Sequence, residues 1–148
     1  ILRNSWSLSL WLVLFLFYGT GAGVFANDVG IIQTEMVKTA EWVNSNTPEG
    51  ALIAAHDIGA LGYFGQRELV DLAGLISPEV IPFIRDEEKL GDYLDREEVD
   101  YLITFPGWYP TLVVRGEQIF SSGGKFAPLS GGENMTVYKW SSDHLTQP

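Results

Sequence analysis

The sequence predicts an α/β protein with an N-terminal transmembrane helix, then a small three-layer domain with a mostly parallel sheet and an antiparallel C-terminal extension. Three observations predict this class. Positions 4–27 hold 24 consecutive uncharged residues, most of them apolar. Short apolar runs then alternate with amphipathic or charged stretches, as in strand–helix–strand units. After residue 110, short segments are separated by Gly-Gly pairs, which are typical of turns between antiparallel strands.

The uncharged run is long enough to cross a bilayer, because about 20 helical residues at about 1.5 Å each span a hydrocarbon core of about 30 Å. A signal peptide is the competing interpretation, since Arg3 precedes the apolar residues 8–17 and small residues lie near Ala26. The length of the run and its aromatic residues, such as Trp11, favour a retained span. We therefore expect a transmembrane helix over 1–27 and a soluble domain over 28–148.

Charge indicates where the soluble domain works. The formal net charge is −10, and Arg3 is the only charged residue before Asp28, so residues 28–148 carry one negative charge more, −11. Nucleic acid would repel such a domain and is not an expected partner. Arg3 on one side and the acidic domain on the other place residues 28–148 on the extracytoplasmic side of the cell membrane, with membrane lipid as a partner.

The absence of cysteine excludes disulfides, thiol catalysis and Cys-ligated zinc. It fits a bacterial exported domain that does without disulfides. The chain begins at Ile1 rather than Met, and we expect it to be a fragment or a processed product.

The soluble part reads as helices and strands in alternation. Asn27 or Asp28 can cap a first amphipathic helix, and Ser77-Pro78 is a typical helix start. We expect helices at 28–46, 58–64, 78–84 and 86–97. We expect strands at 51–55, 68–72, 99–105, 112–114, 117–121 and 135–140, and a frayed tail from 141 to 148.

Polar and aromatic residues follow the first three strands. His56 and Asp57 come after the first, Asp71 ends the second, and Trp108 and Tyr109 follow the third. Ligands collect at the carboxyl ends of parallel strands, so these five residues form a candidate ligand-binding site. A histidine with two aspartates suits a divalent ion or a pair of sugar hydroxyls, and flat aromatic rings suit the C–H face of a sugar.

Structural roles compete with this interpretation. Asp57 can cap the helix that follows it, and Asp71 can bond to the loop that contains Asp57. Trp108 can cover the end of the core or touch the membrane-proximal surface. We assign no catalytic residue, no metal and no cofactor to the chain.

Several segments together resemble a known family. They are Trp42-Val43, Thr47-Pro-Glu-Gly-Ala51, Ala55-His-Asp-Ile-Gly-Ala-Leu-Gly-Tyr-Phe64, Arg67-Glu-Leu-Val-Asp-Leu-Ala-Gly-Leu75 and Val99-Asp-Tyr-Leu102. In this order after a hydrophobic span, they resemble the C-terminal end of bacterial polytopic glycosyltransferases of the GT-C type. The resemblance covers roughly residues 6–110.

The resemblance implies a specific setting. In such enzymes a membrane body of many helices transfers a sugar from a polyprenyl-phosphate donor, and a soluble domain follows the last span. The family's catalytic acids lie in early loops of the membrane body, and no position in this chain corresponds to them. The implied partners are a glycan or polyprenyl-linked sugar and the remaining transmembrane helices of the parent protein.

The expected function is therefore that of a non-catalytic domain that supports a membrane glycosyltransferase or binds its acceptor. One alternative is a stand-alone exported or membrane-anchored ligand-binding module without enzymatic activity. Another is a purely structural domain that packs against partner helices through Gly19–Gly23.

Overall fold

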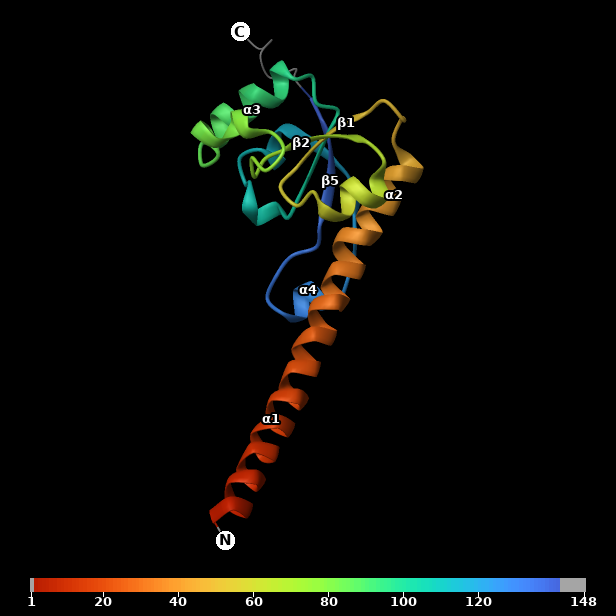
Figure 1. The fold of residues 1–148 in the computed structure, drawn as a ribbon. Coiled ribbons are helices and arrows are strands. Elements are labelled where there is room, and N and C mark those ends of the chain that lie inside the picture. Colours follow the sequence, from red (N-terminus) through yellow and green to blue (C-terminus); the bar gives the residue numbers. More distant parts are fainter. Residues whose placement is uncertain (1, 142–148) are drawn as a thin grey trace.

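The computed structural model describes residues 2–141, and a continuous helix occupies the first third of them (Figure 1). It comprises α1 (Leu2–Ile31), a π-helical segment η1 (Ile32–Val37) and α2 (Lys38–Asn46). All side chains from position 4 to 26 are exposed. The helix is long and apolar enough to cross a membrane, a property that a signal sequence near the N-terminus shares.

The expected helix cap at residue 27 or 28 is absent. The helix runs through the predicted boundary between the apolar segment and the domain and ends at Asn46. No proline or other strong helix breaker occurs before Pro48, so nothing in the sequence interrupts the backbone hydrogen bonds at this point. The apolar segment and the first helix of the domain are one element.

A five-stranded sheet follows the helix, in the spatial order β2-β1-β3-β5-β4. Its strands are β1 (Leu52–Ala55), β2 (Glu68–Asp71), β3 (Tyr101–Thr104), β4 (Gly116–Ser121) and β5 (Thr136–Trp140). β1 pairs in parallel with β2 and β3, whereas β5 pairs antiparallel with β3 and β4. The predicted antiparallel extension is present, but the sheet is mixed rather than mostly parallel because the extension contributes as many strand pairs as the parallel part.

Short helical segments connect the strands. The predicted charged helix is α3 (Glu87–Arg96), and the Asp86 carboxylate accepts a hydrogen bond from the Lys89 N–H at its start. The expected strand at 112–114 is wrong, because a 3₁₀ turn occupies Val113–Arg115 and the chain only becomes extended at Gly116. The remaining segments are η2 (Leu61–Gly65, π), η3 (Pro78–Phe83, 3₁₀), η4 (Pro106–Trp108, 3₁₀), η5 (Val113–Arg115) and α4 (Phe126–Leu129).

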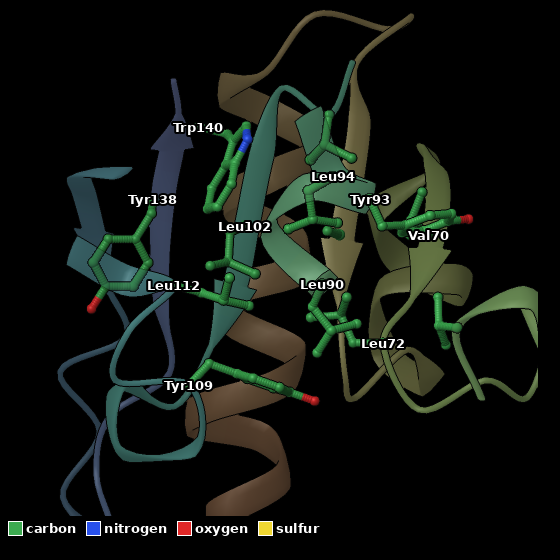
Figure 2. Packing of buried hydrophobic residues seen from close by; sticks show 13 residues of the cluster. Val70, Leu72, Leu90, Tyr93, Leu94, Leu102, Tyr109, Leu112, Tyr138 and Trp140 are labelled. Atoms are coloured by element: carbon green, nitrogen blue, oxygen red, sulfur yellow. The ribbon is translucent and has the colours of Figure 1, made fainter. Parts of the chain in front are cut away.

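Buried apolar residues cover both faces of the sheet. On one face, Leu102 of β3 lies in a cluster with Leu90 and Leu94 of α3 (Figure 2). On the other face, the next residue, Ile103, lies in a cluster with Val43 of α2. Successive side chains of a strand point to opposite faces, so β3 contributes alternate residues to the two clusters. Helices therefore pack on both sides of the sheet.

The carboxyl ends of the parallel strands face back along the long helix. A short loop joins α2 to β1, so the chain reverses direction and β1 returns toward α1 (Figure 1). Residues just after β3, including Phe105 and Trp108, lie near Ile31 and Met36 of the helix, around a shared hollow. This edge of the sheet is consequently the one nearest to the apolar segment.

A buried carboxylate joins the helix to the C-terminal part of the sheet. Glu35 of η1 is fully buried, with an exposed fraction of 0%. Its carboxylate accepts hydrogen bonds from the Met135 N–H (2.9 Å), the Asn134 amide nitrogen (3.0 Å) and the Ser122 hydroxyl. Gly124 lies so close that a Cβ at this position would collide with the Glu35 carboxylate and with Thr34. The loop between β4 and β5 is thus shaped around this side chain.

Replacing Glu35 is expected to destabilise the domain. In Glu35→Ala, the buried Met135 N–H and Ser122 hydroxyl lose their acceptor, and each unsatisfied group costs about 1–3 kcal/mol, so we expect a loss of roughly 2 kcal/mol or more. The measurement is thermal unfolding of the full chain in detergent micelles, followed by near-ultraviolet circular dichroism. Glu41→Ala, an exposed site on α2, is the control and should leave the midpoint unchanged. Equal midpoints for both variants would contradict the role of Glu35.

Candidate functional site

The candidate site lies where the order of the strands reverses. From β1 the chain passes through η2, which packs beside α2, to reach β2 on one side. From β2 it passes through α3 on the opposite face to reach β3 on the other side of β1. The connections therefore diverge at the carboxyl ends of β1 and β3, and open α/β sheets bind ligands in the crevice at such a point.

An open pocket of about 400 Å³ occupies this position. Three of the five sequence-predicted residues line it: His56, which directly follows β1, and Trp108 and Tyr109, which follow β3. The other lining residues come from the segment that leads into α3, namely Ile84, Arg85 and Glu87. The structure thus brings the ends of two adjacent strands and one crossing segment together.

A hydrogen bond between His56 and Tyr109 closes the floor of the pocket. The His56 Nδ1 and the Tyr109 hydroxyl oxygen are 2.7 Å apart. Tyr109 is buried and belongs to the core cluster on the α3 face, so its hydroxyl is held in place (Figure 2). Burial first, and then the negative charges of Glu87 and Asp71, raise the pKa of Tyr109 to about 12. The phenol therefore stays protonated at neutral pH.

Trp108 forms the exposed wall of the pocket. Its ring meets the His56 ring edge to face at a centroid distance of 5.0 Å and contacts the Phe105 ring at 4.9 Å. These contacts fix the ring, yet 51% of the residue stays exposed. A large aromatic side chain that is held by its neighbours and open to solvent is typical of a surface that receives a ligand.

The charged residues of the pocket differ in how they are engaged. The Glu87 carboxylate accepts hydrogen bonds from the backbone N–H groups of Thr111 (2.7 Å) and Leu112 (3.1 Å). It therefore fixes the loop after Tyr109 onto the start of α3. Within residues 2–141, no carboxylate forms an ion pair with the exposed Arg85, whose guanidinium remains available to a ligand at the rim of the pocket.

The two predicted aspartates do not line the pocket. Asp71 is fully buried at the end of β2, where its carboxylate accepts hydrogen bonds from the backbone N–H groups of Ala73 (2.8 Å) and Ile76 (3.0 Å), among others. It bonds to its own following loop rather than to the segment of Asp57. Asp57 is half-buried beside the pocket and does not cap η2, which begins at Leu61. No group of three potential metal ligands occurs among the described residues.

A second, larger hollow adjoins the pocket on the side of the long helix. Its volume is about 570 Å³, and Trp108 lines both hollows. Its other walls are mostly apolar or glycine-rich and come from the helix and from the region of α4. They are Ile31, Met36, Phe105, Gly107, Ala127, Ser130, Gly131, Gly132 and Glu133. Two hollows with mostly apolar linings therefore meet at one tryptophan, and the pocket of His56 is the one that also holds Arg85 and Glu87.

The arrangement can bind but offers no constellation for covalent catalysis. A protonated phenol, an imidazole, a guanidinium and an indole ring suit a ligand that has hydroxyl or anionic groups and a flat apolar face. Sequence reasoning missed Ile84, Arg85 and Glu87, because none of them follows a strand and 86–88 has the pattern of a solvated helix face. Only the order of the strands, in which the chain crosses from β2 over β1, could have indicated that this segment reaches the pocket.

The fold and the site define an α/β domain on a long apolar helix, with a pocket at the reversal point of its sheet. The chain belongs to the family described as a domain of unknown function, DUF8728, whose family model matches residues 30–138. The match begins within α1 and ends in β5, so it includes the helix that carries Glu35 and the whole candidate site. No curated protein and no solved structure matches the chain.

The Tyr109 phenol is expected to titrate at about pH 12 rather than at its usual value of 10.0. The measurement is the phenolate absorbance of the full chain in detergent minus that of Tyr109→Phe across the alkaline range. A raised folded pKa means that Tyr109 stabilises the fold fully below pH 10 and loses this contribution as the pH rises to about 12. A difference titration with its midpoint near 10 would show that the hydroxyl is solvated.

Proposed function

We propose that this chain is a membrane-anchored, non-catalytic domain that binds the sugar part of a glycan or a polyprenyl-linked sugar at the membrane surface. One observation carries the proposal. The pocket at the reversal point of the sheet, walled by the half-exposed Trp108, lies on the edge that faces the uncharged segment of the long helix. A ligand in this pocket would be held close to the bilayer that the helix enters.

The lining of the pocket supports a sugar ligand. The exposed indole of Trp108 offers a flat apolar surface that matches the C–H face of a pyranose. His56 and Arg85 offer polar groups for hydroxyls, and the Arg85 guanidinium is suited to an anionic substituent. These groups bind and orient a ligand, and the chemistry of group transfer would come from elsewhere.

The adjoining hollow supports a lipid-linked form of that ligand. Ile31, Met36 and Phe105 give this hollow an apolar lining, and it extends from Trp108 toward the helix. A molecule with a sugar head and an aliphatic chain could place its head in the pocket and the first part of its chain in the hollow. The apolar helix then serves as the membrane anchor, with residues 28–148 on the extracytoplasmic side as Arg3 and the acidic domain indicate.

In the more specific form of the proposal, the domain supports a membrane glycosyltransferase of the GT-C type. This form rests on the resemblance of the segments between Trp42 and Leu102 alone. The helix would pack with the remaining transmembrane helices of that enzyme, which would supply the catalytic acids. The alternative is a membrane-anchored or exported binding module that acts by itself through the same pocket.

Loss of the Trp108 ring is expected to weaken sugar binding. Trp108→Ala removes a stacking surface worth about 1 kcal/mol, so affinity should fall roughly fivefold or more. The measurement is a titration of the full chain in nanodiscs with a panel of oligosaccharides and a short-chain polyprenyl-phosphate sugar. Tyr63→Ala removes an exposed aromatic ring outside the pocket and should bind like the unmodified chain. Equal affinities in all three proteins would exclude the pocket as the sugar site.

Whether the partner is a membrane glycosyltransferase can be tested from the gene sequence. If the domain supports a transferase of this type, the reading frame upstream of the Ile1 codon should encode several further hydrophobic spans, with acidic residues in the first outer loop. Sequencing that region and mapping the topology of the encoded protein provides the measurement. A start codon directly before Ile1 would favour the independent binding module instead.

A further inference from the structure

We infer that α4 is a second membrane contact, which dips into the interface of the same bilayer leaflet that the long helix enters. This inference rests on the membrane attachment in the proposed function, and not on sugar binding. It concerns the loop between β4 and β5, residues 122–135, which the sequence analysis treated as turns.

The position of α4 along the helix is the first argument. The ring of Phe126 lies against Gly30, where a Cβ would come within 2.8 Å of it, so the two helices are in contact. One turn lower, the Asn27 side-chain nitrogen and the Ser130 hydroxyl oxygen are 3.1 Å apart. Asn27 is the last residue of the uncharged run. The loop thus reaches down to the level at which the apolar segment ends.

Figure 1 shows the same relation at a larger scale. α4 lies beside α1, apart from the strands and displaced toward the N-terminal half of the long helix. The strands β4 and β5 lead to it because their linked ends lie at the same edge of the sheet as the carboxyl ends of β1 and β3. No other described element of the C-terminal part approaches the apolar segment so closely in this view.

The exposed side chains of α4 give the second argument. Leu129 is 84% exposed, and Phe126 is 41% exposed. Leu129 directly precedes Ser130, whose hydroxyl contacts Asn27 at the end of the uncharged run. Leu129 and Phe126 therefore add exposed apolar surface on the side of the helix that α4 covers, as an interfacial element does.

Charge is the third argument, and it favours a lipid headgroup region as the surface that α4 contacts. Residues 122–135 contain one cation, Lys125, and one acid, Glu133, so the loop has no net charge although residues 28–148 carry a net charge of −11. An anionic headgroup would repel most of the domain but not this loop. A lipid interface with apolar depth and negative charge therefore fits α4 better than it fits any acidic face of the domain.

Two points of contact would fix the domain where the helix alone would not. A single helix lets the domain turn about the helix axis, whereas a second contact to one side prevents this rotation. The edge of the sheet that bears His56 and Trp108 would then face the bilayer in one orientation.

The absence of native cysteine allows a direct test of depth. The full chain carries a single nitrobenzoxadiazole label at Leu129→Cys, Phe15→Cys or Val114→Cys and is reconstituted into vesicles of phosphatidylcholine and phosphatidylglycerol. Phe15 lies within the uncharged run, and Val114 is 76% exposed at the opposite end of the sheet. Spin-labelled lipids then quench the label from shallow or deep acyl positions, and iodide quenches it from water.

We expect the label at position 129 to show blue-shifted emission and quenching by the shallow spin label, and the label at 15 to be quenched by the deep one. The label at 114 should be quenched by iodide alone. If 129 behaves like 114 while 15 is quenched from lipid, the role of α4 is overturned and the anchor stands. If 15 is also accessible only to iodide, the membrane anchor fails and the inference fails with it. Sugar binding is measured separately on Trp108→Ala.

Discussion

The burial of the Glu35 carboxylate is the interaction on which the arrangement of this molecule depends. A carboxylate taken out of water needs full hydrogen bonding, and it obtains this from the loop between β4 and β5, about 100 residues later in the chain. The bond network fixes the π segment of the helix against the antiparallel half of the sheet. The parallel half is fixed to the same helix by Ala40 and Val43, so both halves share one support.

This support also determines where the pocket lies. Because the helix packs against the sheet beside the carboxyl ends of β1 and β3, the reversal point of the strand order opens next to Ile31 and Met36. A general property of open sheets, a crevice at the point where connections diverge, is thus combined with closeness to an apolar segment. The proposal of a ligand at a membrane surface rests on the juxtaposition of these two features.

Much of the secondary structure followed from the sequence because local signals agreed with the tertiary fold. The strand at 51–55 is an apolar run, those at 68–72 and 99–105 are rich in apolar and β-branched residues, and α3 has both its cap at Asp86 and its buried stripe. The strand expected at 112–114 failed, since β-branched Val113 and Val114 favour extension locally while tertiary contacts hold a 3₁₀ turn. The helix start predicted at 27–28 is wrong, because a residue that can cap a helix does not end the preceding one unless a helix-breaking residue is also present.

The candidate site was predictable only in part. His56, Trp108 and Tyr109 follow strands, so the rule for parallel sheets located them. Asp71 also ends a strand, but its carboxylate accepts hydrogen bonds from backbone N–H groups of its own loop and is not free to bind a ligand. The residue type alone does not reveal which of these two roles an aspartate has. The role of Glu35 depended on a contact about 100 residues away, and no pattern along the helix distinguishes it from a solvated acid.

The unbroken helix has a mechanical consequence. Because α1 continues through the π segment η1 into α2 without a break, a tilt of the apolar segment in a bilayer would be passed on to the sheet. Each residue inserted between the two parts would swing the pocket by about 100° around the helix axis, as expected from 3.6 residues per turn. Bilayer thickness, which sets helix tilt, would thereby set the height and angle at which the pocket meets the headgroups.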